Sequence, residues 1–171
     1  IPQEQSITPT ESGIPAGFIV NPQGTRLYVM YFGPLGTTSD AVSQYSIDGS
    51  GNLSKEASFT LGGVGRGPGQ TVFTSDGAFV YIADHNAFKI YSYKVNGGIF
   101  TPLNEVDTFV TPTVATLDPG NKFLYVTSAS GGMTTIQTYQ VQRTGALVFV
   151  EAVMPVVNPM DIALTPDGAF A

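Results

Sequence analysis

Two neighbouring segments carry the side chains best able to do chemistry. His85, the only histidine of the chain, lies in the sequence Asp84-His-Asn-Ala, and Arg66 lies in the glycine-rich segment 62–69. An imidazole exchanges protons near neutral pH, a carboxylate such as that of Asp84 can orient it, and a guanidinium binds carboxylates or phosphates. The three residues therefore form a candidate catalytic group if the fold brings both segments together. The alternative is that His85 and Asp84 only close a turn and that Arg66 is a solvated charge.

The motifs of other chemistries are absent from the sequence. The chain has no cysteine, no Gly-x-Ser-x-Gly nucleophile motif and no His-Glu-x-x-His zinc motif. Segment 62–69 lacks the Gly-Lys-Ser/Thr ending of a phosphate-binding loop, and segment 48–52 lacks the acidic residue that closes a calcium loop. We therefore predict no cofactor and no metal site.

Composition restricts the partners and the compartment. A net charge of −6 with seven Lys and Arg leaves no basic patch that could neutralise a row of phosphates, so nucleic acid is not expected as a partner. No stretch approaches the roughly 20 apolar residues of a membrane-spanning helix. Charged residues make up only 12% of the chain, which favours an extracellular or periplasmic location. The cytoplasm is the alternative, because a chain without cysteine suits a reducing compartment equally well.

Two sequence motifs recur along the chain. The first is a turn of Pro, Asp or Ser with Gly, followed by an apolar run that contains a tyrosine. The second is an alternating apolar and polar strand centred on Tyr45, Tyr93 and Tyr139, at spacings of 48 and 46 residues. A further turn and another extended stretch follow each of these tyrosines, so the repeating unit has four strands. Copies of the first motif occupy 21–29, 74–82 and 117–126, and a fourth begins at 165–170.

The four expected strands of each unit are named a to d in chain order. Strand b is apolar on both faces, so both faces must be covered, as in a blade stacked between two neighbours. A four-stranded repeat of about 45 to 50 residues is typical of a β-propeller, whereas a β-sandwich, the alternative, needs no repeat. We expect strand a at 16–20, 70–73, 113–117 and 160–164, strand b at 27–32, 79–83 and 123–127, strand c at 42–47, 90–95 and 136–141, and strand d at 56–61, 104–110 and 147–153.

The predicted fold is thus all-β, a β-propeller of about three and a half four-stranded blades, with no helix. We expect an N-terminal segment at 1–15, blade 1 at 16–61, blade 2 at 62–110, blade 3 at 111–154 and the start of a truncated blade 4 at 155–171.

The turn, the Phe-x-Tyr-Val run and the Tyr-centred strand resemble those of the lactonase-type propellers, which include 6-phosphogluconolactonase-like and YVTN-repeat proteins. The resemblance covers residues 17–171 and implies a ring of seven blades, about half of which this sequence supplies. It also implies lactone hydrolysis. For that reaction His85 would activate water, Arg66 would hold a carboxylate or phosphate substituent, and Asp84 would orient the imidazole or take a proton itself.

The half-ring length predicts an exposed blade face and an open edge that something must cover. The sequence is a fragment of a longer polypeptide, or two copies close one seven-bladed ring, or identical chains stack end to end. The last two alternatives predict self-association through the open blade edges.

Loops at one mouth of a propeller surround its central opening, and two sets of loops share that mouth. These are the d-to-a connections, such as 62–69, and the b-to-c loops, such as 84–87 and the longer 33–40. We therefore expect Arg66 and His85 at one mouth. Two functions remain: a binding or assembly module that contacts a protein partner or itself through loops and blade faces, which we prefer, and a lactone hydrolase acting on a small lactone or sugar-derived ligand.

Overall fold

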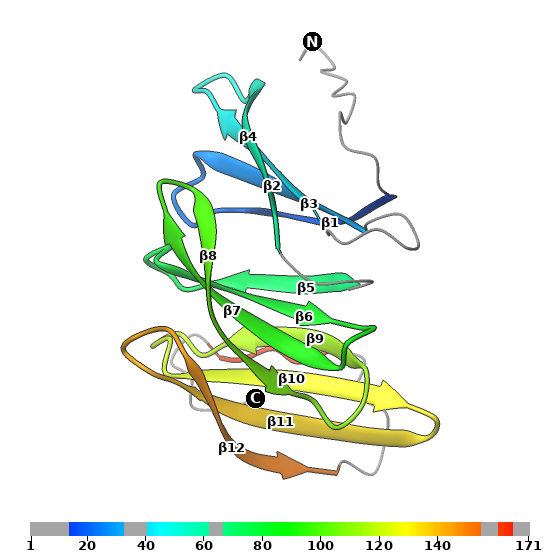
Figure 1. The fold of residues 1–171 in the computed structure, drawn as a ribbon. Helices are drawn as coiled ribbons and strands as arrows, with labels where there is room; N and C mark the ends of the chain where they lie inside the picture. The colour runs from blue at the N-terminus through cyan, green and yellow to red at the C-terminus, as the bar shows by residue number, and fades with distance from the viewer. Residues whose placement is uncertain (1–13, 33–40, 62–66, 155–160, 166–171) are drawn as a thin grey trace.

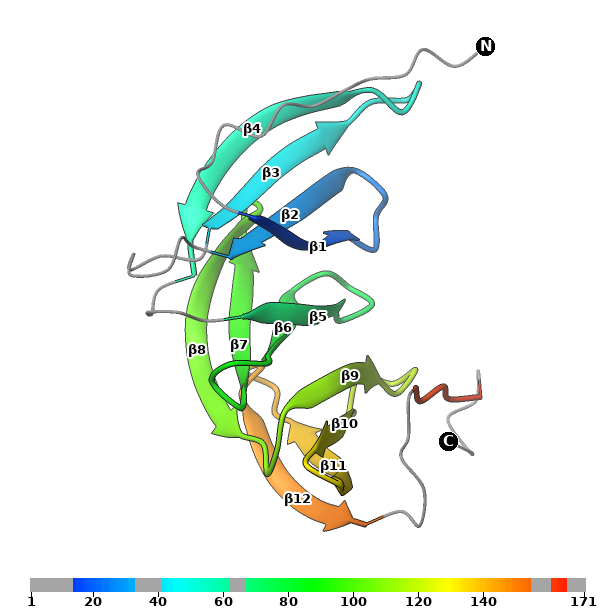
Figure 2. The same cartoon turned by 90° about the vertical axis from the view of Figure 1, so that its right-hand side faces the viewer.

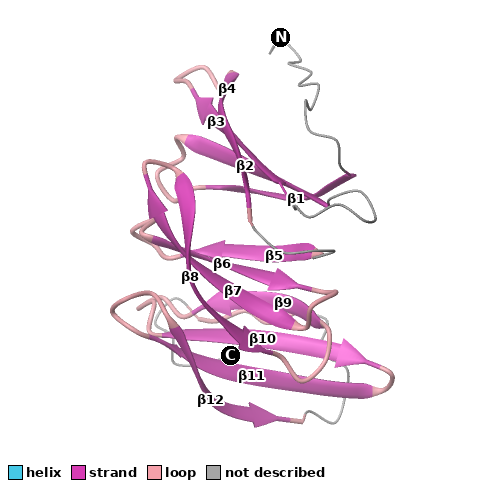
Figure 3. Cartoon of the chain, viewed as in Figure 1, coloured by secondary structure: helices cyan, strands magenta, loops and turns pink. Residues whose placement is uncertain are grey.

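The computed structural model of the chain describes residues 14–32, 41–61, 67–154 and 161–165. In these residues twelve strands form three four-stranded antiparallel sheets, and no helix occurs (Figure 3). Blade 1 comprises β1 (Ile14–Val20), β2 (Arg26–Phe32), β3 (Ala41–Ile47) and β4 (Leu53–Thr60); blade 2 comprises β5 (Pro68–Phe73), β6 (Phe79–Asp84), β7 (Lys89–Asn96) and β8 (Ile99–Asp107); blade 3 comprises β9 (Pro112–Leu117), β10 (Phe123–Ser130), β11 (Met133–Val141) and β12 (Leu147–Val153).

The three sheets stack face against face in chain order (Figure 1). Within each sheet the strands are paired in sequence order, so the first strand forms one edge and the fourth the other. Figure 2 shows β1, β5 and β9 along the inner side of the stack and β4, β8 and β12 along the outer side. This is the arrangement of propeller blades, and it confirms the predicted all-β fold of four-stranded repeats.

The turns between the first two strands of each blade are built by their own side chains. Asn21 Oδ1 accepts hydrogen bonds from the backbone N–H groups of Thr25 (2.9 Å) and Arg26 (2.8 Å). Asp118 does the same for Lys122 in blade 3. Such short polar side chains replace backbone partners in tight turns, which is why the turn motif was visible in the sequence.

The hydrophobic core lies between the blades, since both faces of each second strand are apolar. Met30 and Tyr28 of β2 face blade 2, and Tyr81 of β6 faces blade 3. The buried residues between blades 1 and 2 are Tyr28, Met30, Val42, Leu61, Phe73, Val80, Ile82, Tyr91, Tyr93 and Phe100. Those between blades 2 and 3 are Tyr81, Ala83, Ile90, Ala115, Leu124, Val126, Tyr139 and Leu147.

Two of the predicted strand positions were wrong. Strand d of blade 2 was expected at 104–110, but β8 spans Ile99–Asp107. Gly97 and Gly98 have φ values of 57° and 93° and form a tight turn, so β8 starts directly after β7. A strand was also expected at 160–164, whereas residues 161–165 form none. Residues 166–171 lie outside the described residues.

Each inner strand contains a β-bulge directly after a proline: Pro15 in β1, Pro68 in β5 and Pro112 in β9. At a bulge one strand gains a residue relative to its partner, which bends the strand and redirects its side chains. The residues at the three bulges are Ala16, Gly69 with Gln70, and Thr113.

Candidate functional site

The bulges of the three inner strands meet at one cavity of about 370 Å³. Their strands lie side by side on the inner side of the stack (Figure 2). His85, from the loop between β6 and β7, contributes the only titratable side chain among the described lining residues. The cavity is lined by Ala16, Gly17, Phe18, Gly69, Gln70, Thr71, His85 and Thr113.

A glycine at position 69 makes room for the imidazole of His85. A Cβ atom at this position would lie 2.7 Å from Nε2 and 2.9 Å from Cε1 of His85, closer than atoms can approach. Gly67 makes room in the same way for Asn86, whose Nδ2 would lie 2.8 Å from a Cβ there. Gly67 and Gly69 therefore let the two loops approach each other.

Hydrogen bonds join the same two loops. The backbone N–H of His85 donates to the carbonyl oxygen of Gly67 at 3.0 Å. The carboxylate of Asp84, only 1% exposed, accepts through Oδ1 from the N–H groups of Gly67, Asn86 and Ala87, each at 2.9 Å. Among the described residues, Asp84 thus bonds to the backbone of the loop that carries His85. This geometry makes it a positioning residue for that loop, and a direct role toward the imidazole stays a prediction.

Arg66 and the loop at 33–40 lie outside the described residues. The predicted meeting of Arg66 with His85 is therefore untested, although Gly67, the next residue in the chain, contacts the His85 loop.

The remaining polar groups of the cavity were not found by sequence reasoning. Gln70 is exposed, so its amide can donate to or accept from a ligand. Thr113 Oγ1 lies 2.9 Å from Thr127 Oγ1, which holds its side chain in place. The signal that would have found these residues is the proline that stands at the same place before the turn in every blade. The cavity thus combines neutral hydrogen-bonding groups with one side chain capable of proton transfer.

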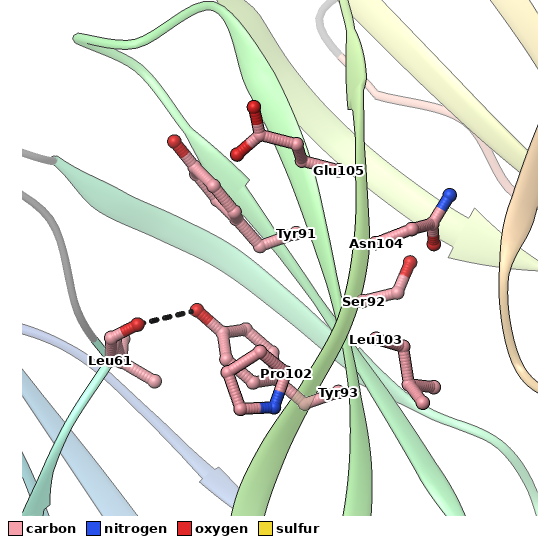
Figure 4. A pocket seen from close by; sticks show the side chains of 8 residues that line it. All are labelled: Leu61, Tyr91, Ser92, Tyr93, Pro102, Leu103, Asn104 and Glu105. Atoms are coloured by element: carbon pink, nitrogen blue, oxygen red, sulfur yellow. Dashed lines mark hydrogen bonds between the residues drawn. The ribbon is translucent and has the colours of Figure 1, made fainter.

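A second cavity, of about 360 Å³, lies at the outer strands of blade 2 (Figure 4). Its wall includes Tyr93, whose hydroxyl donates to the carbonyl oxygen of Leu61 at 3.2 Å and so ties blade 2 to the end of blade 1. Leu103 lies at the bulge of β8, where the strand departs from its pairing with β7. The lining is mainly apolar, and its described titratable residues are Tyr91, Tyr93 and Glu105. Its lining residues are Leu61, Tyr91, Ser92, Tyr93, Pro102, Leu103, Asn104 and Glu105.

Two other kinds of feature are absent from the described residues. No three His, Cys, Asp or Glu side chains gather closely enough to hold a metal ion. No helix in this part of the chain is long and apolar enough to cross a membrane.

Comparison with known families identifies the fold more specifically. The family model described as "Lactonase, 7-bladed beta-propeller" matches residues 18–171. The chain belongs to this family. The resemblance predicted from the turn and tyrosine motifs is therefore confirmed. No curated protein matches the chain.

Solved structures similar to this lactonase-family chain are about twice its length. A candidate 6-phosphogluconolactonase of Bacteroides fragilis superposes with a TM-score of 0.76 at 21% identity, over 94% of this chain and 48% of that one. The periplasmic gluconolactonase of Pseudomonas aeruginosa gives 0.74 at 19% identity, over 90% and 43%. The chain therefore spans less than half the length of these relatives, and at this identity the likeness shows the fold alone.

Proposed function

We propose that this lactonase-family chain forms part of a lactone-hydrolysing site in which His85 is the general base. The observation that carries the proposal is the place of His85, whose imidazole lines the cavity formed by the inner strands of three blades. Exposed neutral groups such as Gln70 surround it, and they suit a small polar lactone or sugar-derived ligand. The family to which the chain belongs supports the same reaction.

The reaction needs one proton to move twice. The imidazole of His85 takes a proton from water while the water oxygen bonds to the lactone carbonyl carbon. The bond between that carbon and the ring oxygen then breaks, and the ring oxygen takes the proton back from the imidazolium. The product is the open hydroxy acid. Asp84 contributes indirectly, because its hydrogen bonds hold the loop that presents His85.

The test is hydrolysis of D-glucono-1,5-lactone, followed by acid release with the protein-free rate subtracted. His85→Gln keeps a polar side chain of similar size and should lower kcat by roughly 100-fold to 10,000-fold, the usual contribution of a general base. Thermal unfolding should change little, because the imidazole lies at the cavity wall. Undiminished turnover in this variant would remove His85 from the reaction.

Arg66 is tested with a matched control. In the proposal its guanidinium holds an anionic substituent, so Arg66→Ala should raise KM for a phosphorylated lactone more than for an uncharged one. Arg143→Ala removes the same charge from the exposed turn between β11 and β12 and should leave both KM values unchanged. Equal changes of KM in the two variants would show that Arg66 acts only through the overall charge of the protein and does not hold the substituent.

A second candidate function is association with a protein partner or another copy, and exposed apolar residues on β12 and in the connection between β8 and β9 favour it. Phe109 and Phe149 are 55% and 44% exposed, with ring centroids 5.7 Å apart. Val150 beside them is half exposed. Light scattering should then give a mass above the 18.0 kDa of one chain, and Val150→Glu should lower it. A mass of one chain in both proteins would contradict this function.

A further inference from the structure

We infer that the second cavity, at the outer strands of blade 2, binds a small organic cation, that is, a molecule with a positively charged ammonium group and an apolar body. Its volume of about 360 Å³ lies at the lower end of the range for ligand sites. The cavity shares no described lining residue with the His85 cavity, so the inference does not depend on lactone hydrolysis.

Two tyrosines form an aromatic wall of this cavity. Tyr91 and Tyr93 stand two residues apart on β7, so their side chains point to the same face of the sheet. The hydroxyl of Tyr93 donates to Leu61, and its ring centroid lies 6.1 Å from that of Phe100, which fixes the position of the ring. Aromatic rings attract ammonium groups through the negative charge of their faces. A fixed aromatic wall therefore suits an organic cation.

A carboxylate stands beside the aromatic wall. Glu105 pairs with Tyr91 in the register between β7 and β8, so the two side chains lie opposite each other on the same face of the sheet. Figure 4 shows both side chains extending in the same direction. Glu105 is an exposed lining residue, so a ligand that enters from the solvent can reach its carboxylate.

Lys89, a described cation beside Glu105, does not cancel the negative charge of this region. Its Nζ lies 2.7 Å from Oε1 of Glu105 and 2.9 Å from Oδ1 of Asp107, so one ammonium group serves two carboxylates. No Lys or Arg is among the described lining residues. The remaining negative charge attracts a cation and repels an anion. The mainly apolar lining favours an ammonium group with an apolar body over a bare metal ion, which needs several oxygen ligands.

The first experiment titrates the protein with choline, 3,3-dimethylbutan-1-ol and 3,3-dimethylbutanoate, which have nearly the same shape and are positive, neutral and negative. NMR of the nitrogen-15-labelled protein measures both the affinity and the place of binding. At low salt choline should bind at least about fivefold more tightly than the alcohol, and the anion should bind least. Added salt should reduce the difference. The shifted amide signals should belong to residues 91–93 and 103–105 and not to residues 69–71 of the His85 cavity.

Two pairs of variants test the residues. Glu105→Gln should weaken choline binding about fivefold and leave the alcohol unchanged. Glu151→Gln removes an exposed carboxylate on β12 and should change neither affinity. Tyr91→Leu removes an aromatic ring and should weaken choline binding roughly twofold to fivefold, whereas Tyr91→Phe keeps the ring and should bind choline as the wild type does. Thermal unfolding checks the fold of each variant, and if Tyr91→Leu does not fold, the two glutamate variants decide.

Equal affinities for the three probes would show an apolar cavity without a charge preference and would overturn the inference. Absence of choline binding, shifts confined to residues 69–71, or equal losses in Glu105→Gln and Glu151→Gln would overturn it as well. The proposed reaction fails separately. Choline binding by a protein that hydrolyses no lactone supports this inference and counts against the reaction, whereas hydrolysis without choline binding overturns this inference and leaves the reaction standing.

Discussion

The two interfaces between neighbouring blades both bury apolar side chains and a tyrosine hydroxyl that donates to the end of the preceding blade, yet each has one feature that the other lacks. Between blades 1 and 2, Phe100 is the centre of an aromatic cluster. Its ring centroid lies 4.8 Å from that of Tyr28, 5.1 Å from that of Phe59 and 5.9 Å from that of Phe73. These rings come from both blades, so burying them holds the blades together.

Between blades 2 and 3, a buried side-chain amide adds hydrogen bonds to the apolar contacts. Gln137 is fully buried, and its Nε2 donates to the hydroxyl of Tyr139 at 2.7 Å. Its Oε1 accepts from the backbone N–H of Phe109 at 3.2 Å. The Tyr139 hydroxyl donates in turn to the carbonyl oxygen of Asp107 at 2.8 Å, which links blade 3 to the end of blade 2.

The difference shows that a propeller repeat specifies the geometry of its interfaces more strictly than their chemistry. Apolar contact is nondirectional and tolerates many ring arrangements, so any set of large side chains that fills the space will serve. A buried hydrogen-bond network stabilises only when every member has its partner. Substitutions should therefore affect the first interface through lost volume and the second through unpaired polar groups.

The largest expected effect is at the aromatic cluster. Phe100→Ala should lower the free energy of unfolding by about 3–5 kcal/mol, because it removes buried contacts and leaves a cavity. Ile99→Ala is the control on the same strand, where the side chain is 40% exposed, and should cost less than half as much. Urea denaturation measures both. Similar losses in the two variants would mean that the cluster does not hold the interface.

The second-largest effect on stability is expected at the buried side-chain amide of Gln137. Gln137→Ala should lower the free energy of unfolding by about 2 kcal/mol, since it leaves the Phe109 N–H without its acceptor and the Tyr139 hydroxyl without its donor. Thr138→Ala, the neighbouring residue on the opposite face of β11, should cost less. If Gln137→Leu proved as stable as wild type, apolar contact would suffice at both interfaces and the contrast would disappear.

A smaller, pH-dependent effect should come from Tyr139. Burial, with a further contribution from Asp107, raises the pKa of its phenol above the usual range. The folded protein thus holds this proton more tightly than the unfolded chain does. The resulting stability is complete below about pH 10, the pKa of a free tyrosine, and is lost as the pH rises above it.

Tyr139→Phe should cost about 1 kcal/mol at pH 7, where only a hydrogen bond is lost, and should lessen the decline above pH 10. Thermal unfolding between pH 7 and 11 measures both quantities. An alkaline decline of the same size in the variant would assign it to other groups, for example Tyr81, whose pKa burial also raises.

The smallest effect should come from the exposed contacts between the turns. Gln23 Nε2 donates to the carbonyl oxygen of Asp76 at 3.0 Å and bridges blades 1 and 2 at the surface. Because water competes for such a bond, Gln23→Ala should change the free energy of unfolding by less than about 0.5 kcal/mol. A loss close to that of Gln137→Ala would show that surface bonds hold the interfaces as firmly as buried ones.

The candidate site was only partly predictable from the sequence. His85 was found because a single histidine in a loop is conspicuous, and it lines the cavity. Gln70 and Thr113 were missed, because side-chain alternation along a strand says nothing about a bulge, which appears only when two strands are paired. Asp84 was expected to act on the imidazole, but its observed hydrogen bonds go to backbone groups that only the folded loops bring together.

The sequence by itself determined the repeat, the four-stranded unit and the turns, because turn side chains and strand alternation act over a few neighbouring residues. It did not determine how the blades are held to one another or which residues line the cavity at the three bulges. The approach of His85 to Gly69 and the bonds of Gln137 to Phe109 join atoms from different strands and blades. Only the tertiary structure decided these, since contacts between distant segments depend on how whole sheets stack.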